Sequence, residues 1–267
     1  MLELQSRRKT FYPGTVNAKT ALDGVSLTLR DGDFVTLIGS NGAGKSTLMN
    51  AIAGTFRPDE GKILLDGRDI TALPDFRRSK FIGRMFQDPM KGTAPHMTIE
   101  ENLALAYLRA VRGRSPFSMI TGADRQEFRQ RLADLHLGLE DRMQQPVGLL
   151  SGGQRQALTL LMATLVPPKL LLLDEHTAAL DPATAEKVLD LTKAIVAEHH
   201  ITCLMVTHNV TAALALGNRT VMMDAGKIAL DLAGPDRDGL TPEGLLALFR
   251  KSGAESDRLL FSVGTRA

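Results

Sequence analysis

The stretch Gly39-Ser40-Asn41-Gly42-Ala43-Gly44-Lys45-Ser46-Thr47 decides the fold of this 267-residue chain. It fits the pattern G-x-x-x-x-G-K-[ST], in which the backbone N–H groups of a glycine-rich loop surround phosphate oxygens. The apolar run Phe34–Ile38 before it predicts a buried strand, and apolar residues at helical spacing after Lys45 predict a helix. This strand–loop–helix context predicts an α/β fold that binds a nucleoside triphosphate.

Each part of this phosphate loop has an expected task. Gly42 and Gly44 allow a tight turn and a close approach of the backbone. The following helix directs its positive end at the phosphates. Lys45 is expected to reach the β- and γ-phosphates, and the Ser46 hydroxyl is expected to hold Mg²⁺.

A second nucleotide motif is predicted at Leu170–Glu175, which reads LLLLDE. Four consecutive leucines favour a strand that is buried on both faces. Asp174 at its end is expected to hold Mg²⁺, directly or through water, and Glu175 to polarise the attacking water. The alternative is a strand that ends in an ordinary acidic turn.

A further anion-binding motif lies at Ser151-Gly152-Gly153-Gln154. Ser151 is expected to cap a helix, and the two glycines leave the helix start bare enough to approach an anion. The alternative is a capped helix without a ligand. Because one chain cannot easily fold this motif and the phosphate loop around one nucleotide, the second motif is expected to serve a nucleotide held by a partner chain. The pair therefore predicts half of an ATP-operated clamp.

Two polar residues are expected at strand ends. His208 follows the apolar run Ile201–Val206, where a side chain faces the ligand crevice of an open sheet, and it could bond the γ-phosphate. Gln87 ends the run Phe81–Gln87, and its amide could reach Mg²⁺ or the water. The alternatives are a structural histidine and a polar strand end.

The rest of the chain predicts one domain over residues 1–267. Residues 1–88 and 150–232 are expected to form the core and a β subdomain. Helical periodicity, broken by a loop near Gly113–Gly122, predicts a helical insertion over 89–149. Asp181-Pro182 predicts a helix start, residues 221–232 predict a hairpin, and 233–267 form a short C-terminal extension.

Composition restricts the function classes. The net charge of +2 does not by itself indicate nucleic-acid binding, and the single cysteine suits a reducing compartment. The N-terminus lacks an apolar signal core, and no run is apolar enough to span a bilayer, so a cytosolic protein with at most a peripheral membrane role is expected. The basic cluster Arg77-Arg78-Lys80 is expected to be solvated.

Together these residues resemble the ATP-binding-cassette (ABC) family, from about Leu4 to Leu232. Gly39–Thr47 matches its Walker A motif, Leu170–Glu175 its Walker B motif, Gln87 its Q-loop, Ser151–Gln154 its signature motif, Ala179–Asp181 its D-loop and His208 its switch histidine. Tyr12 stands 27 residues before Gly39, where family members place the aromatic ring that stacks on adenine. A surface tyrosine in a turn is the alternative.

The resemblance implies a P-loop NTPase fold with a RecA-like core, an antiparallel β subdomain and an inserted helical subdomain. It implies that two copies pack head to tail around two MgATP and that hydrolysis releases them, with Glu175, His208, Gln87 and Lys45 as catalytic residues and Asp181 beside the nucleotide. In transporters the helical insertion grips an integral membrane permease at the cytoplasmic face of the inner (plasma) membrane.

The resemblance also implies a direction of transport. Phe86–Ala94 and Met97–Ala104 are similar to segments of bacterial ATPases that serve small-solute importers with an external solute-binding protein. Some of these importers carry amino acids, aromatic ones included. In two places the chain departs from the family pattern, since His176 stands where many cassettes have proline and the helix after Gln154 lacks a frequent second arginine.

The resemblance is compatible with three function classes: a cassette that acts on DNA or the ribosome, a transporter subunit and a soluble assembly cassette. A DNA-acting cassette is disfavoured because only 134 residues separate Gly39 from Asp174, without sustained heptads, and a ribosome-acting one because the chain has one cassette. No nucleic-acid partner is therefore expected. A transporter subunit and a soluble cassette of an assembly system, such as iron–sulfur cluster biogenesis, remain open.

Overall fold

The computed structural model describes residues 1–111 and 120–251. These residues form two compact units. One contains Met1–Arg78 and the segment from Thr202 onward, and the other contains Ser79–Ile201. The division into residues 1–88 with 150–232, a helical insertion over 89–149 and an extension over 233–267 stays a prediction.

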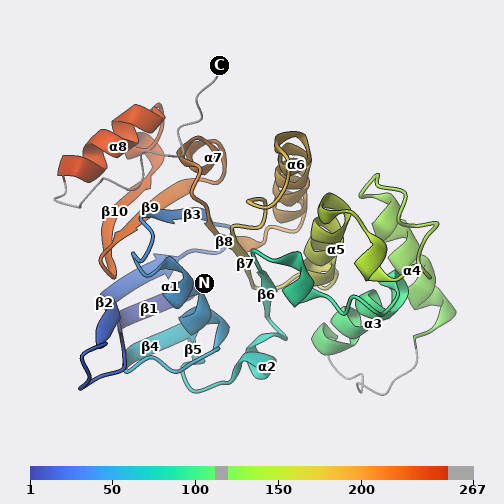
Figure 1. Ribbon diagram of the computed structural model, residues 1–267, viewed down its shortest axis with the longest axis horizontal. Helices are drawn as coiled ribbons and strands as arrows, with labels where there is room; N and C mark the ends of the chain where they lie inside the picture. The colour runs from blue at the N-terminus through green and yellow to red at the C-terminus, as the bar shows by residue number, and fades with distance from the viewer. Residues whose placement is uncertain (112–119, 252–267) are drawn as a thin grey trace. The chain divides into compact units, whose positions relative to one another are not determined.

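The first unit contains an antiparallel sheet with the strand order β2-β1-β4-β5 (Figure 1). Its strands are β1 (Leu2–Phe11), β2 (Lys19–Leu29), β4 (Glu60–Leu65) and β5 (Arg68–Asp69). β1 pairs with both β2 and β4, and Leu4 lies opposite Leu27 on one side and Ile63 on the other. All three side chains are buried. The expected antiparallel β subdomain is confirmed.

The same unit contains strands in the order β10-β9-β3-β8. These are β3 (Phe34–Gly39), β8 (Thr202–Val206), β9 (Arg219–Asp224) and β10 (Lys227–Ala233). β3 runs parallel to β8 and β9, while β9 and β10 form an antiparallel hairpin. Every residue of β3 and β8 is buried, as expected for parallel strands that are covered on both faces. The predicted strands and hairpin are confirmed.

Helices complete the first unit. They are α1 (Lys45–Ala53), α2 (Asp75–Arg78), α7 (Val210–Ala215) and α8 (Pro242–Lys251), with a 3-10 turn η3 (Gly234–Asp236). α7 and α8 bury apolar side chains against β3 and β9 in one cluster, which contains Ile38, Val210, Ala213, Met222, Leu245, Leu246 and Phe249. The helix α8 in the predicted C-terminal extension therefore belongs to the core of this unit.

The second unit pairs β6 (Ile82–Met85) in parallel with β7 (Leu170–Asp174). Its helices are α3 (Ile99–Ala110), α4 (Gly122–Ala133), α5 (Gly152–Thr164) and α6 (Pro182–Glu198), with the 3-10 turns η1 (Pro89–Gly92) and η2 (Val147–Leu149). A core cluster that includes Leu103, Phe128 and Leu158 joins α3, α4 and α5.

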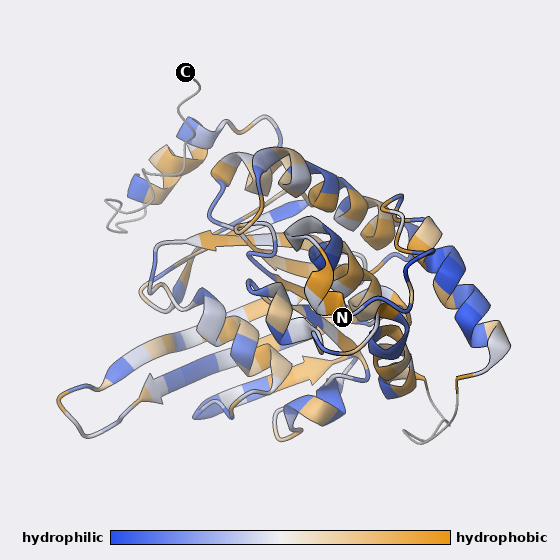
Figure 2. Cartoon of the chain, turned by 45° about the vertical axis from the view of Figure 1, so that its right-hand side comes forward, coloured by the Kyte–Doolittle hydropathy of each residue, from blue (hydrophilic) through white to orange (hydrophobic). Residues whose placement is uncertain are grey.

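The predicted helical stretch is confirmed at α3 and α4, while most of its loop, residues 112–119, lies outside the described residues. α4 presents mainly hydrophilic residues, as its colour in Figure 2 shows, and buries Asp124, Phe128 and Leu132. Over the described ranges, no helix has the length and apolarity needed to cross a membrane.

The expectation that the basic cluster is solvated is wrong for Arg78, whose exposed fraction is 1%. Its guanidinium donates hydrogen bonds to the carbonyls of Ala51 (2.8 Å) and Ile52 (2.7 Å) in the last turn of α1. It also donates to the carbonyls of Leu73 (2.8 Å) and Thr71 (3.0 Å). A cation is favourable at a helix C-terminus because the last carbonyls lack partners within the helix. Burial lowers the pKa of Arg78 to about 10, so it stays charged at neutral pH.

Replacing Arg78 should destabilise the protein much more than replacing its neighbour. Arg78→Met leaves buried carbonyls at the end of α1 without a donor, which should lower the free energy of unfolding by about 3 kcal/mol. Arg77→Met is the matched control, because Arg77 is exposed, and its effect should stay within about 0.5 kcal/mol. Urea denaturation measures both. Equal effects would contradict the anchoring role of Arg78.

Candidate nucleotide-binding site

The phosphate loop joins β3 to α1 and lies against the backbone of two other strands. Gly39 and Gly44 have φ angles of +150° and +101°, which side chains rarely allow. A Cβ added to Gly39 would lie 2.3 Å from the carbonyl oxygen of Met223, and one on Gly44 would lie 2.4 Å from that of Ala21. Gly39 and Gly44 are therefore required by packing within the chain, whether or not a ligand is bound.

The start of α1 is suited to an anion. Its N-cap residue is Gly44, and no side chain caps the helix. The helices α3, α4, α5, α6 and α7 all begin with a side chain that accepts a hydrogen bond from the first turn. The backbone N–H groups of α1 thus lack the side-chain acceptor that those helices use, and the helix dipole adds a positive field there.

Two lysines lie beside the loop. Lys45 is 5% exposed, and its Nζ donates to the carbonyls of Gly39 (2.7 Å) and Ser40 (3.0 Å). Lys19, on β2, places its Nζ 3.6 Å from the position of a Cβ on Gly42. Sequence reasoning missed Lys19, because only the packing of β2 on the loop brings it there.

His208 lies near the loop within the first unit. β3 and β8 are parallel neighbours, and the Thr207 N–H donates to the carbonyl of Leu37 at 3.2 Å. The residues that follow both strands therefore leave the sheet at the same edge. His208 is half-buried there. This is the predicted position for contact with a phosphate held by the loop.

Tyr12 lies on the segment between β1 and β2. Its side chain is 70% exposed, and its φ of +52° is unusual for a residue other than glycine. The Thr15 backbone N–H (3.3 Å) and hydroxyl (2.8 Å) both donate to the Tyr12 carbonyl, which holds this turn. The exposed ring could stack on a base, as predicted.

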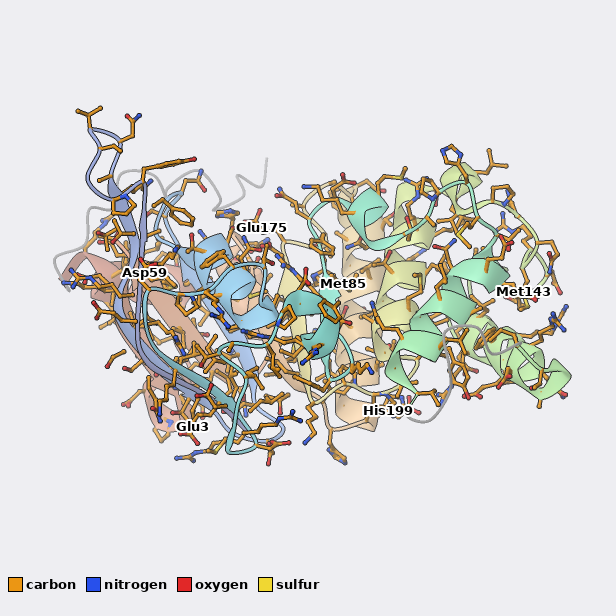
Figure 3. The ribbon with its side chains drawn as sticks, turned by 90° about the horizontal axis from the view of Figure 1, so that it is seen from below. Glu3, Asp59, Met85, Met143, Glu175 and His199 are labelled. Atoms are coloured by element: carbon orange, nitrogen blue, oxygen red, sulfur yellow. The ribbon has the colours of Figure 1, made fainter. Side chains whose placement is uncertain are left out.

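In the second unit, the acidic pair and Gln87 follow neighbouring strands. Met85 on β6 lies opposite Leu173 on β7, so both strands end at one edge. Gln87 is exposed two residues after Met85, whereas Asp174 and Glu175 are half-buried. Glu175, labelled in Figure 3, has a left-handed φ of +47°. Its position directly after β7 is the one that the sequence predicts.

Asp174, at the end of the predicted Walker B motif, contacts an arginine that the sequence pattern does not indicate. The Nη2 atom of Arg84, on β6, lies 3.9 Å from Oδ2 of Asp174. The guanidinium also lies over the ring of Phe86, 4.5 Å from its centre. Burial lowers the pKa of Arg84, and Asp174 opposes that shift. The sequence of β6 alone does not predict this contact between Arg84 and Asp174, because the contact arises only from the pairing of β6 with β7.

The signature segment starts α5 as predicted. The Ser151 hydroxyl accepts from the Gln154 N–H at 3.3 Å, and the Gln154 amide oxygen accepts from the Ser151 N–H at 3.2 Å. This capping box leaves the Ser151 hydroxyl with its own O–H to donate. Asp181 caps α6 by accepting from the Thr184 N–H at 3.0 Å.

Close packing is a second reason why glycines occupy positions 152 and 153, besides the predicted approach to an anion. A Cβ on Gly153 would lie 2.2 Å from Cγ2 of Thr184, and one on Gly152 would lie 3.3 Å from Cδ2 of Leu180. The starts of α5 and α6 therefore touch through these glycines. Within this unit, the signature segment and the D-loop form one surface.

The structure distributes the predicted residues over both units. The first holds Tyr12, Gly39–Thr47 and His208, and the second holds Gln87, Ser151–Gln154, Asp174, Glu175 and Asp181. Functions that combine residues of both units rest on the resemblance and stay predictions.

The donor chemistry fits the predicted Mg²⁺. A serine hydroxyl, an amide oxygen and a carboxylate, from Ser46, Gln87 and Asp174, are the hard oxygen ligands that this ion prefers. Across residues 1–111 and 120–251, no group of three or more His, Cys, Asp and Glu could hold a metal.

Gly44→Ala should damage the phosphate loop. The added methyl group meets the Ala21 carbonyl at 2.4 Å in a backbone conformation unfavourable for alanine, so the loop must shift. We expect at least a tenfold loss of ATP affinity, measured with a fluorescent nucleotide. Gly122→Ala, which meets no atom within 4 Å, is the matched control and should keep wild-type affinity. Tight binding by Gly44→Ala would contradict the role of the loop.

Comparisons with known proteins agree with this geometry. The family model described as ABC transporter matches residues 22–178. The tyrosine transport ATP-binding protein of Clostridioides difficile (strain R20291) is 42% identical over 249 residues, which cover 93% of this chain and 98% of that protein. The methionine import ATP-binding protein MetN of Rhizobium johnstonii is 38% identical, over 78% of this chain and 55% of its own length. The chain thus spans about half of MetN.

Solved structures agree as well. A dimeric ATP-binding cassette in a post-hydrolysis state, bound to ADP and Pi, is 30% identical with a TM-score of 0.75, and the match covers 87% of this chain and 98% of that one. The ADP conformation of another cassette from an ABC transporter is 27% identical with a TM-score of 0.74, over 94% and 98% of the two chains. The chain therefore belongs to the ABC transporter family, as an ATP-hydrolysing, nucleotide-binding subunit.

Proposed function

We propose that this subunit dimerises around two MgATP and powers the import of a small solute, an aromatic amino acid such as tyrosine, through a membrane permease. The observation that carries the proposal is the 42% identity to a tyrosine transport ATP-binding protein over 98% of that protein's length. Relatives named for methionine and spermidine/putrescine import support the direction of transport.

Nucleotide binding in this proposal begins at the first unit. The uncapped start of α1 and the loop backbone receive the phosphates, while Tyr12 stacks on the base. Lys45 exchanges its bonds to the carbonyls of Gly39 and Ser40 for the β- and γ-phosphates. Mg²⁺, when bound, neutralises phosphate charge, and Ser46, Gln87 and Asp174 would hold it.

Hydrolysis then depends on residues at strand ends. Glu175 accepts a proton from the attacking water, a role that typically contributes about 10²- to 10⁴-fold in rate. His208 bonds the γ-phosphate and stabilises the charge that develops on it. Gln87 positions the water or the metal and connects the site to the segment that follows β6.

The signature segment acts on the nucleotide of the opposing copy. The Ser151 O–H and the N-terminus of α5 donate to phosphate oxygens held by the partner's loop, and Asp181 lies beside that interface. ATP thus joins two copies head to tail, and its hydrolysis lets them separate. The dimeric state of the cassette solved with ADP and Pi supports this arrangement.

Coupling to transport occurs at the membrane in this proposal. The helical segment after Gln87 grips the cytoplasmic side of permease subunits, so that the protein is peripheral to the inner membrane. An external solute-binding protein delivers the solute to the permease. The transport names of the relatives favour this function over the assembly-system alternative.

Glu175→Gln should keep ATP binding but lower turnover at least 100-fold, because the amide cannot accept the proton of the attacking water. The variant should also accumulate an ATP-bound dimer in light-scattering measurements. Glu186→Gln, a change of the same kind at an exposed position of α6, is the control and should behave as wild type. Near-normal turnover by Glu175→Gln would show that another group is the base.

Ser151→Arg should abolish hydrolysis while nucleotide binding by the isolated monomer stays intact. The new side chain blocks the partner's triphosphate, but it also removes the cap of α5. Thr121→Arg separates these effects, since Thr121 caps α4 with the same capping box. It should cost about 1 kcal/mol of stability and keep ATPase activity. Equal loss of monomer binding in Ser151→Arg would place Ser151 in its own chain's pocket.

Transport itself can be measured directly. The tagged chain, captured from detergent-solubilised membranes, should bring down a multi-helix membrane protein. Reconstituted in proteoliposomes with its solute-binding protein, the complex should take up labelled tyrosine in an ATP-dependent manner and should not take up spermidine. Co-purification with soluble assembly proteins alone would favour the alternative, and uptake of another solute would revise the substrate.

A further inference from the structure

The segment between β7 and α6 carries a proposed catalytic residue at one end and a proposed dimer-contact residue at the other. Glu175 follows β7, and Asp181 caps α6. Glu175 has the left-handed φ of +47°. A residue other than glycine keeps such a conformation only where the surrounding structure fixes it. The contacts of the residues next to Glu175 therefore matter for its backbone conformation.

The residue after Glu175, His176, is deeply buried. His176 is 2% exposed, whereas the side chains from Thr177 to Asp181 are half-buried or exposed. Backbone turns close the segment, with the Ala178 N–H donating to the Glu175 carbonyl at 3.0 Å. Between Glu175 and Asp181, His176 is thus the side chain most deeply buried in its unit.

The hydrogen bond of His176 defines its tautomer. The hydroxyl of Thr192, a fully buried residue of α6, lies 3.2 Å from the imidazole Nε2. The same hydroxyl lies 2.7 Å from the carbonyl of Val188, which can only accept. Because a hydroxyl has one proton, it donates to Val188 and accepts from Nε2–H. His176 therefore carries a proton on Nε2 and donates it to Thr192.

Burial of the other ring nitrogen lowers stability. Nδ1 of His176 is buried without a hydrogen-bond partner. A buried polar atom without a partner is unfavourable, so packing alone would favour an apolar side chain of similar size here. What the imidazole adds is the bond from Nε2 to Thr192, which fixes the orientation of the ring and links the residue after Glu175 to α6.

We infer that His176 is a positioning residue for Glu175. Its bond to Thr192 ties the end of β7 to α6 and holds the Glu175 carboxylate where it can accept the proton of the water. The inference rests on the proposed role of Glu175 as the base. It adds a function for the residue that departs from the family pattern at this position.

Two matched pairs of variants test the bond. His176→Gln keeps a donor near the position of Nε2, whereas His176→Asn places its amide near Nδ1, out of reach of Thr192. Thr192→Ser keeps the hydroxyl, and Thr192→Val removes it at nearly constant volume. His176→Asn and Thr192→Val should lower kcat about tenfold, part of the contribution of a positioned base, with KM for ATP and affinity for ADP unchanged. His176→Gln and Thr192→Ser should restore most of the turnover.

A combined variant separates positioning from stability. Adding Thr192→Val to Glu175→Gln should cause no further loss in single-turnover hydrolysis, because there is no base left to position. A further tenfold loss, or wild-type kcat in both His176→Asn and Thr192→Val despite a lower Tm, would make His176 a purely structural residue. If Glu175→Gln alone keeps wild-type turnover, the proposed base is wrong, which is a separate failure.

The wild-type protein offers a test that needs no substitution. In ¹⁵N-labelled protein at pH 7, the two-bond couplings of His176 should report the tautomer with the proton on Nε2. A ring with its proton on Nδ1 and none on Nε2 would overturn the hydrogen-bond assignment and with it the inference.

Discussion

The contact of backbone with backbone around the phosphate loop is the constraint on which the first unit depends. At Gly39 and Gly44 the chain passes so close to the carbonyls of Met223 and Ala21 that no Cβ fits. β9 and β2 therefore lie directly on the loop and fix its curvature before any ligand arrives. Fixed donors need no reorganisation when a charged group binds, which is why preorganisation contributes both to affinity and to catalysis.

The N-termini of α1 and α5 differ in whether a side chain caps their first backbone N–H groups. α1 begins at a glycine without any side-chain cap, whereas α5 begins with the reciprocal bonds of Ser151 and Gln154. A bare start offers several backbone donors in one direction, which suits a triphosphate that the chain itself holds. A capped start is stable alone and offers a hydroxyl, which suits the transient contact with a second copy that we propose.

Within each unit, the positions of the candidate site residues could be predicted because parallel strands place their carboxyl ends at one edge. Gln87 and Asp174 follow from β6 and β7, and His208 follows from β8, all visible as short apolar runs. Arg84 and Lys19 could not be predicted, since each acquires its role from a strand distant in sequence. The expectation that Arg78 is solvated is wrong because its partners are backbone carbonyls, which the pattern of side chains does not reveal.

Several of the places where this chain breaks local rules coincide with places where we propose chemistry. Glu175 and Tyr12 have left-handed φ angles, α1 lacks a side-chain cap, and His176 buries an unpartnered nitrogen. Folding alone favours none of these features, and packing elsewhere must offset them. The apolar cluster over α3, α4 and α5 supplies this offsetting stabilisation in the second unit. In the first unit, the hydrogen bonds that Arg78 donates to the end of α1 supply it. Because α1 is held at its C-terminal end by a buried cation, its N-terminal end can stay bare for a triphosphate.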